Sequence, residues 1–127
     1  QEYIDGFDIT IIGYVHGDKN FMIKKIYKEK NYFNKDGSIK HNGFVKFIIP
    51  KDTNYFKQIK KAINLIVLKS NLQFVPINFN FRISKNKKKS YLNELNLYFG
   101  GENLIENDFD FISDYFKFIK ANKYYEI

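Results

Sequence analysis

Residues 53–69 read TNYFKQIKKAINLIVLK, and residues 74–84 read FVPINFNFRIS. In the first stretch apolar residues recur every three or four positions with lysines between them, which predicts a helix with one apolar face. In the second stretch apolar and polar residues alternate, which is typical of a strand with one buried face. A strand that follows such a helix indicates a sheet covered by helices.

The same two patterns continue toward both ends of the chain. The predicted strands cover residues 7–15, 21–33, 39–49, 74–84 and 91–99, and the predicted helices cover residues 53–69 and 108–122. Turn-rich intervals separate the first three strands, and a lysine-rich loop separates the last two, which predicts hairpins. Gly43 indicates a β-bulge or a site of close backbone approach in the third strand. Pro76 lacks an N–H group, which favours the beginning of the fourth strand or an edge position.

The element order βββαββα predicts one α+β domain over residues 1–127. We expect a two-layer sandwich in which a mainly antiparallel sheet of about five strands carries both helices on one face. A chain of 127 residues buries one such core and not two. Because 44% of the residues are hydrophobic and 19% are aromatic, we expect the chain to fold.

Charge is distributed unevenly along the sequence. Residues 19–89 hold eighteen of the 21 basic residues and three of the 14 acidic ones, a net charge of +15. Residues 1–18 and 90–127 each carry a net charge of −4, and the whole chain carries +7. A block of like charge must face water or a polyanion, because burial of unpaired ammonium groups is prohibitive. The central segment therefore predicts a basic surface.

Two parts of this segment are candidates for that surface. The loop 85–90 places four lysines at a hairpin tip, where they could bind phosphates. The second strand combines lysines with aromatic residues, as sheet surfaces that bind single-stranded nucleic acids do. The candidate macromolecule-binding residues are Lys24, Lys28, Lys30, Arg82, Lys85, Lys87, Lys88 and Lys89.

Each candidate also has a purely structural interpretation. The lysine loop could be a solvated turn that protects a sheet edge, and the second strand could be an ordinary half-exposed strand. Twenty of the 21 basic residues are lysine, and Asn, Ile, Phe and Tyr are abundant, a composition typical of AT-rich coding sequence. Lysine supplies a point charge and not the planar fork with which arginine binds phosphate. Composition alone leaves both interpretations open.

The sequence contains no motif that specifies a reaction. Cysteine is absent, so disulfides and thiol chemistry are excluded, and His16 and His41 are the only histidines. The acidic residues around the last helix lack the spacing of a calcium loop and are typical of a helix N-terminus. They are Glu102, Glu106, Asp108, Asp110 and Asp114. We therefore expect no enzyme, no cofactor and no metal.

The leading functional hypothesis is a non-enzymatic binding module with a protein or another macromolecule as ligand. Gln1 is not an initiator methionine, which fits a processed chain or a piece of a longer one. We accordingly expect the mature domain of an exported or envelope-associated bacterial protein or lipoprotein. The longest apolar run, residues 65–68, is too short to cross a bilayer, so no transmembrane segment is expected.

The alternative hypothesis is an intracellular, cytoplasmic protein of regulatory or phage-like type that binds nucleic acid through residues 85–90. A small inhibitor or assembly subunit also fits the sequence, and the open sheet face could form a homo-oligomer interface. The two main hypotheses differ in partner and in cellular location. Both require that lysines from the central segment gather on one solvent-facing side.

Overall fold

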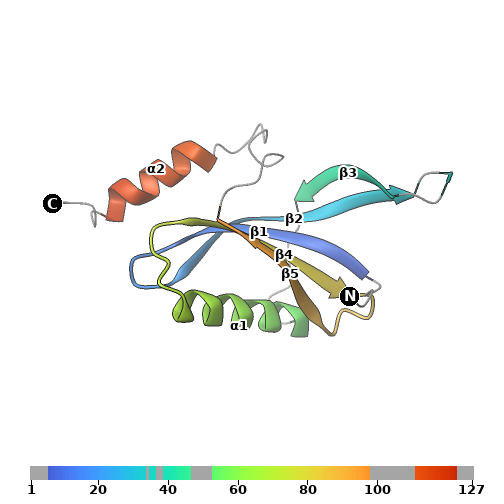
Figure 1. Ribbon diagram of the computed structural model, residues 1–127, viewed down its shortest axis with the longest axis horizontal. Helices are drawn as coiled ribbons and strands as arrows, with labels where there is room; N and C mark the ends of the chain where they lie inside the picture. The colour runs from blue at the N-terminus through green and yellow to red at the C-terminus, as the bar shows by residue number, and fades with distance from the viewer. Residues whose placement is uncertain (1–5, 34, 37–38, 47–52, 98–110, 123–127) are drawn as a thin grey trace.

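The computed structural model describes residues 6–33, 35–36, 39–46, 53–97 and 111–122, with the backbone alone for residues 29–33, 39–46, 111 and 122. The predicted α+β class is confirmed, with an antiparallel sheet and two helices (Figure 1). The elements are β1 (Gly6–Val15), β2 (Phe21–Phe33), β3 (Ile39–Lys46), α1 (Asn54–Lys69), β4 (Pro76–Ser84), β5 (Ser90–Asn96) and α2 (Phe111–Asn122).

Strand β1 lies at the centre of the sheet, whose strand order is β3-β2-β1-β4-β5. Every neighbouring pair is antiparallel, and the register sets Ile11 of β1 opposite Ile26 of β2 and Phe79 of β4. Hairpins join β1 to β2, β2 to β3 and β4 to β5, while α1 lies between β3 and β4 in the chain. The last hairpin therefore lies beside the first strand rather than beside the third.

Three register shifts interrupt the sheet. Between the pairs Glu29–Phe44 and Asn31–His41, β2 contributes one residue and β3 contributes two, Asn42 and Gly43. This confirms the bulge predicted at Gly43. Similar shifts leave one extra residue in β2 near Gly13 and one in β5 near Asn80. Bulges increase local twist and bend the strand that carries the extra residue.

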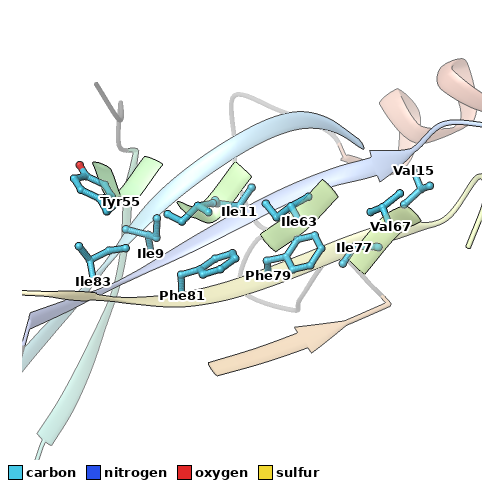
Figure 2. Close-up of a cluster of buried hydrophobic side chains, with 11 residues drawn as sticks. Ile9, Ile11, Val15, Tyr55, Ile63, Val67, Ile77, Phe79, Phe81 and Ile83 are labelled. Carbon is cyan, nitrogen blue, oxygen red and sulfur yellow. The ribbon is translucent and has the colours of Figure 1, made fainter. Parts of the chain in front are cut away.

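The main core lies between α1 and one face of the sheet (Figure 2). Alternate residues of β1 and β4 point toward the helix. Helix residues spaced by four pack against them. The buried cluster consists of Ile9, Ile11, Val15, Tyr55, Ile59, Ile63, Val67, Ile77, Phe79, Phe81 and Ile83. Phe21 of β2 extends this core, since its ring meets the Phe79 ring edge-on at 5.3 Å between centroids.

Helix α2 lies on the opposite face of the sheet from α1 (Figure 1), so the prediction that both helices share one face is wrong. Tyr14 alternates with Val15 on β1 and therefore faces away from α1. Its ring lies 5.2 Å from the ring of Tyr115 and 5.1 Å from that of Phe118 between centroids. Because Ile12 and Tyr14 on this second face are also fully buried, the sheet requires cover on both sides.

The predicted element bounds differ in detail from those observed. Strand β4 begins at Pro76 and not at residue 74, because Phe74 has a φ of 55° in the left-handed region, which no strand residue adopts. Pro76 is the first strand residue, one of the two positions favoured for it. Residues 47–49, 98–99 and 108–110 of the predicted elements lie outside the described residues.

Thr53 occupies the N-cap position of α1. Its backbone carbonyl accepts from the N–H of Lys57 at 3.2 Å, but its side chain makes no capping hydrogen bond. The helix is therefore stabilised mainly by burial of its apolar face.

Candidate binding surface

The tight turn between β4 and β5 has a fixed backbone. The N–H of Ser84 donates to the carbonyl of Lys89 at 3.0 Å, and the N–H of Lys87 donates to the carbonyl of Ser84 at 2.8 Å. Lys87 itself has a φ of 59°, in the left-handed region that a tight reversal requires. All residues from Lys85 to Lys89 are exposed, so four lysine side chains surround a backbone held in one shape.

Side chains within the turn reinforce that shape. The Oδ1 atom of Asn86 accepts from the N–H of Lys88 at 3.0 Å and from the hydroxyl of Ser84 at 2.7 Å. The Oγ atom of Ser84 in turn accepts from the N–H of Lys89 at 3.1 Å. Asn and Ser are suited to such bonds because their short polar side chains reach neighbouring backbone groups. The lysines are thus presented by an ordered turn.

Gln58 joins this turn to α1. Its Nε2 atom donates to the carbonyl of Lys88 at 2.8 Å, and its Oε1 atom accepts from the N–H of Ser90 at 3.0 Å. One side-chain amide therefore satisfies a donor and an acceptor of the hairpin backbone. The second turn of α1 is fixed beside the lysines of the hairpin (Figure 1).

The exposed side of α1 adds further lysines next to the turn. Lys57, Lys60 and Lys61 lie within three residues of Gln58 in α1 and are exposed. Neither α1 nor the turn contains an acidic residue. Glu94 of β5 pairs in register with Asn80, on the sheet face opposite α1. We call the resulting surface the basic face, and it consists of Lys57, Lys60, Lys61, Lys85, Lys87, Lys88 and Lys89.

Replacement of Gln58 by alanine is expected to loosen the turn without unfolding the domain. Gln58 is exposed, so the loss of its three hydrogen bonds to Lys88 and Ser90 should lower the free energy of unfolding by about 1 kcal/mol. Amide hydrogen exchange at Ser90 should accelerate, because its N–H loses the bond to Oε1. The control is Gln73→Ala, which removes an exposed side-chain bond to the Gly17 carbonyl far from the hairpin. Unchanged exchange at Ser90 would show that Gln58 does not fix the turn.

Arg82 does not belong to the basic face, although the sequence suggested it for the binding site. Its Nη1 atom lies 3.3 Å from Oδ1 of Asp8, and each side chain is only 18% exposed. The register sets Asp8 opposite Arg82 on the sheet face away from α1. The guanidinium is thus engaged in an ion pair within the fold.

Lys24 is likewise engaged within the fold. Its Nζ atom lies 3.2 Å from Oδ2 of Asp114 in α2 and 5.7 Å from the centroid of the Tyr14 ring. These contacts connect β2 to α2 on the face opposite α1. Lys24 therefore contributes to the attachment of α2, and its charge is neutralised by a carboxylate from the C-terminal part of the chain.

Lys28 and Lys30 lie in β2, which β1 separates from β4. The Nζ atom of Lys28 is 4.6 Å from the centroid of the Phe7 ring, a cation–π contact on the α1 side of the sheet. Lys30 is within β2, and its side chain is not among those described. Of the eight candidate residues, Lys85, Lys87, Lys88 and Lys89 share the turn, while Lys24 and Lys28 lie in β2 and Arg82 lies in β4.

The contribution of α1 to this surface is not apparent from the sequence. Taken alone, Lys57, Lys60 and Lys61 indicate only the solvated side of an amphipathic helix. Their spacing of three and four residues does predict one shared face, but no local signal shows which hairpin lies beside it. Gln58, the residue that connects the two, has no sequence signature of its own.

The end of β1 and helix α2 form an aromatic junction. The hydroxyl of Tyr115 donates to the carbonyl of Phe74, and burial raises the pKa of Tyr115 above its ordinary value. His16 lies against the ring of Phe118, 5.9 Å between centroids. The hydrogen bond from the N–H of Asn20, assisted by His16, lowers the pKa of the Asp18 carboxyl. These contacts attach α2 and stabilise the β1–β2 turn.

Within the described residues, no group of three or more His, Cys, Asp or Glu side chains is arranged to hold a metal ion. Glu102, Glu106, Asp108 and Asp110 of the predicted acidic cluster lie outside those residues, and Asp114 contacts Lys24. His41 lies in β3, where only the backbone is described. Over the same part of the chain, neither helix is long and apolar enough to cross a membrane.

Comparisons with known proteins describe the fold and not the function. No protein-family model and no curated protein matches the chain. Among solved structures, the chain is similar to part of an L-amino acid ligase from Bacillus licheniformis, with a TM-score of 0.58 and 17% identity. The match covers 80% of this chain and 25% of the ligase, so the chain spans about a quarter of that enzyme's length. A likeness at this identity shows a shared fold alone.

Proposed function

We propose that the domain is a non-enzymatic binding module that holds a polyanionic macromolecule on its basic face. One observation carries the proposal: α1 and the β4–β5 turn, which Gln58 joins, expose seven lysines and contain no acidic residue. Like charges at such density repel one another and are relieved by a polyanion. The ordered turn supports the proposal, because a preorganised backbone lowers the entropy that binding must overcome.

The proposal includes a location. In the leading version the protein is exported or associated with the bacterial envelope, where anionic surface polymers and lipids are available. In the alternative version it is cytoplasmic, and a nucleic acid binds at residues 85–90. The alternative is favoured by the fixed β4–β5 turn, because its lysines are close together in the chain and could contact neighbouring phosphates.

Two soluble polyanions test the proposal by fluorescence anisotropy: heparin and a labelled single-stranded DNA of 20 nucleotides. The variant Lys57→Gln/Lys60→Gln/Lys61→Gln and the variant Lys87→Gln/Lys88→Gln/Lys89→Gln should each bind at least about tenfold more weakly than the wild type at low salt. For DNA, each triple replacement should also make the slope of log K against log salt shallower by about 2.

The matched control is Lys117→Gln/Lys120→Gln, which removes charge from exposed positions of α2 on the other side of the sheet. It should retain affinity within about twofold, because distant charges are screened beyond roughly 10 Å. Equal loss in the control would mean that net charge, and not the basic face, determines binding. Wild-type protein that binds neither polyanion would refute the proposal.

A further inference from the structure

The exposed side of α1 is not only basic. Lys61, Leu65 and Leu68 recur at spacings of four and three residues, so they share one stripe of the helix. Leu65 is 49% exposed and Leu68 is 64% exposed. Single exposed leucines are ordinary on protein surfaces. Two on one stripe, continuous with a block of lysines, form an amphipathic surface that faces away from the core.

This stripe borders an open hollow of about 510 Å³. Its lining is mostly apolar, because the hydrocarbon stems of the lysines and the two leucine side chains provide most of its surface. The described residues that line it are Lys57, Lys60, Lys61, Asn64, Leu65 and Leu68. The ammonium groups at the ends of those stems can extend to the rim. The hollow thus combines an apolar floor with cationic edges.

Among polyanions, an anionic lipid surface fits this combination best. Sequence-specific binding of nucleic acid relies on arginine forks, and single-strand binding relies on stacked aromatic rings. The seven residues of the basic face are all lysine. A charged polymer in water gains little from exposed leucines. A bilayer interface accommodates both features, since lysines attract anionic headgroups while leucines enter the boundary of the acyl chains.

We infer that α1 lies on an anionic lipid bilayer with Leu65 and Leu68 inserted at the headgroup boundary and the basic face against the headgroups. This inference rests on the proposed function and specifies its partner. Helix α1 has 16 residues, and at 1.5 Å per residue it extends about 24 Å along the membrane plane. The β4–β5 turn, held to α1 by Gln58, adds its lysines at one end of this contact.

Co-sedimentation with vesicles tests the inference. Wild-type protein should bind vesicles of phosphatidylglycerol and phosphatidylcholine at 100 mM salt and should not bind phosphatidylcholine alone. Lys60→Gln/Lys61→Gln should bind the mixed vesicles about 25-fold more weakly, since each lysine near an anionic surface contributes about fivefold. Leu65→Ala/Leu68→Ala should bind at least about tenfold more weakly, and alanine keeps the helix intact.

Two comparisons make the leucine result specific. Ile112→Ala/Phe116→Ala removes two exposed apolar side chains of similar exposure, 49% and 66%, from α2 and should leave vesicle binding unchanged. Leu65→Ala/Leu68→Ala should retain wild-type affinity for heparin, because it removes no charge. Circular dichroism verifies that each variant is folded.

The outcomes separate the membrane inference from the polyanion proposal. If wild-type protein binds heparin or DNA but not the mixed vesicles, or if the leucine variant binds vesicles as the wild type does, the membrane inference is wrong and the polyanion proposal stands. If neither vesicles nor soluble polyanions bind, both are wrong. Selective loss of vesicle binding in the leucine variant, with heparin binding kept, supports the inference.

Discussion

Replacement of Phe79 by alanine is expected to lower the free energy of unfolding by about 3–5 kcal/mol. Phe79 is completely buried at the centre of β4, between β1 and β5 and beneath α1. Truncation removes the whole ring and leaves a cavity, because the Phe21 ring that meets it edge-on comes from a different strand and cannot refill the space. Urea denaturation followed by circular dichroism measures the change.

Phe116→Ala provides the matched control. It removes the same atoms from α2, where the side chain is 66% exposed, and should change the free energy of unfolding by less than about 1 kcal/mol. If the two variants lost similar amounts of stability, the assignment of the core to the space between α1 and the sheet would be wrong. The pair therefore tests the layer arrangement as well as one residue.

The spacing of apolar residues was sufficient to predict the helices and strands and the first buried face of the sheet. Residues 74–84 alternate so regularly that the sequence suffices to assign Ile77, Phe79, Phe81 and Ile83 to one face. The same reasoning identified α1, whose apolar stripe buries Ile59, Ile63 and Val67 among others. These predictions succeed because alternation and helical repeat are local properties of the chain.

The second face of the sheet could not be assigned in the same way. Alternation places Tyr14 opposite Val15, but it does not state whether the second face meets water or another helix. The burial of Tyr14 depends on Tyr115 and Phe118, which follow it by a hundred residues or more. The prediction of two helices on one face was wrong, because a two-layer arrangement would leave no helix over Ile12 and Tyr14, which are buried.

The candidate surface also combines features that local sequence predicts with features that depend on contacts between remote segments. Lys85 to Lys89 could be predicted as an exposed basic turn, because the turn and its charges are adjacent in sequence. Arg82 and Lys24 could not be removed from the site by sequence reasoning, because their partners Asp8 and Asp114 lie far away in the chain. Ion pairs between remote segments have no signature in local composition. Tertiary structure therefore changes which positive charges remain available to a partner.

Gly13 is a position where the addition of one methyl group should have a large effect. A Cβ atom built on Gly13 would lie 2.1 Å from the carbonyl oxygen of Met22 and 2.6 Å from Cζ of Phe21. Ordinary contacts between such atoms require about 3.5 Å. The register shift beside Gly13 adds Lys24 to β2, so the strand that would have to move is already constrained by a bulge.

Gly13→Ala is expected to lower the free energy of unfolding by about 3 kcal/mol. The sign of the change is itself a test, because glycine to alanine at a position without a clash stabilises a protein by roughly 0.4–1 kcal/mol through the unfolded chain. Thermal and urea denaturation measure the difference. A variant as stable as the wild type would show that β1 and β2 can separate at the bulge without cost.

The double variant Gly13→Ala/Phe21→Leu distinguishes the two contacts. Leucine removes the ring atom at 2.6 Å but leaves the Met22 carbonyl at 2.1 Å, and that carbonyl belongs to the backbone of β2. Since the backbone contact dominates, Phe21→Leu should not rescue the glycine variant, and the coupling free energy should stay below about 0.5 kcal/mol. Recovery of most of the lost stability would instead assign the clash to the Phe21 ring, a side chain that can move.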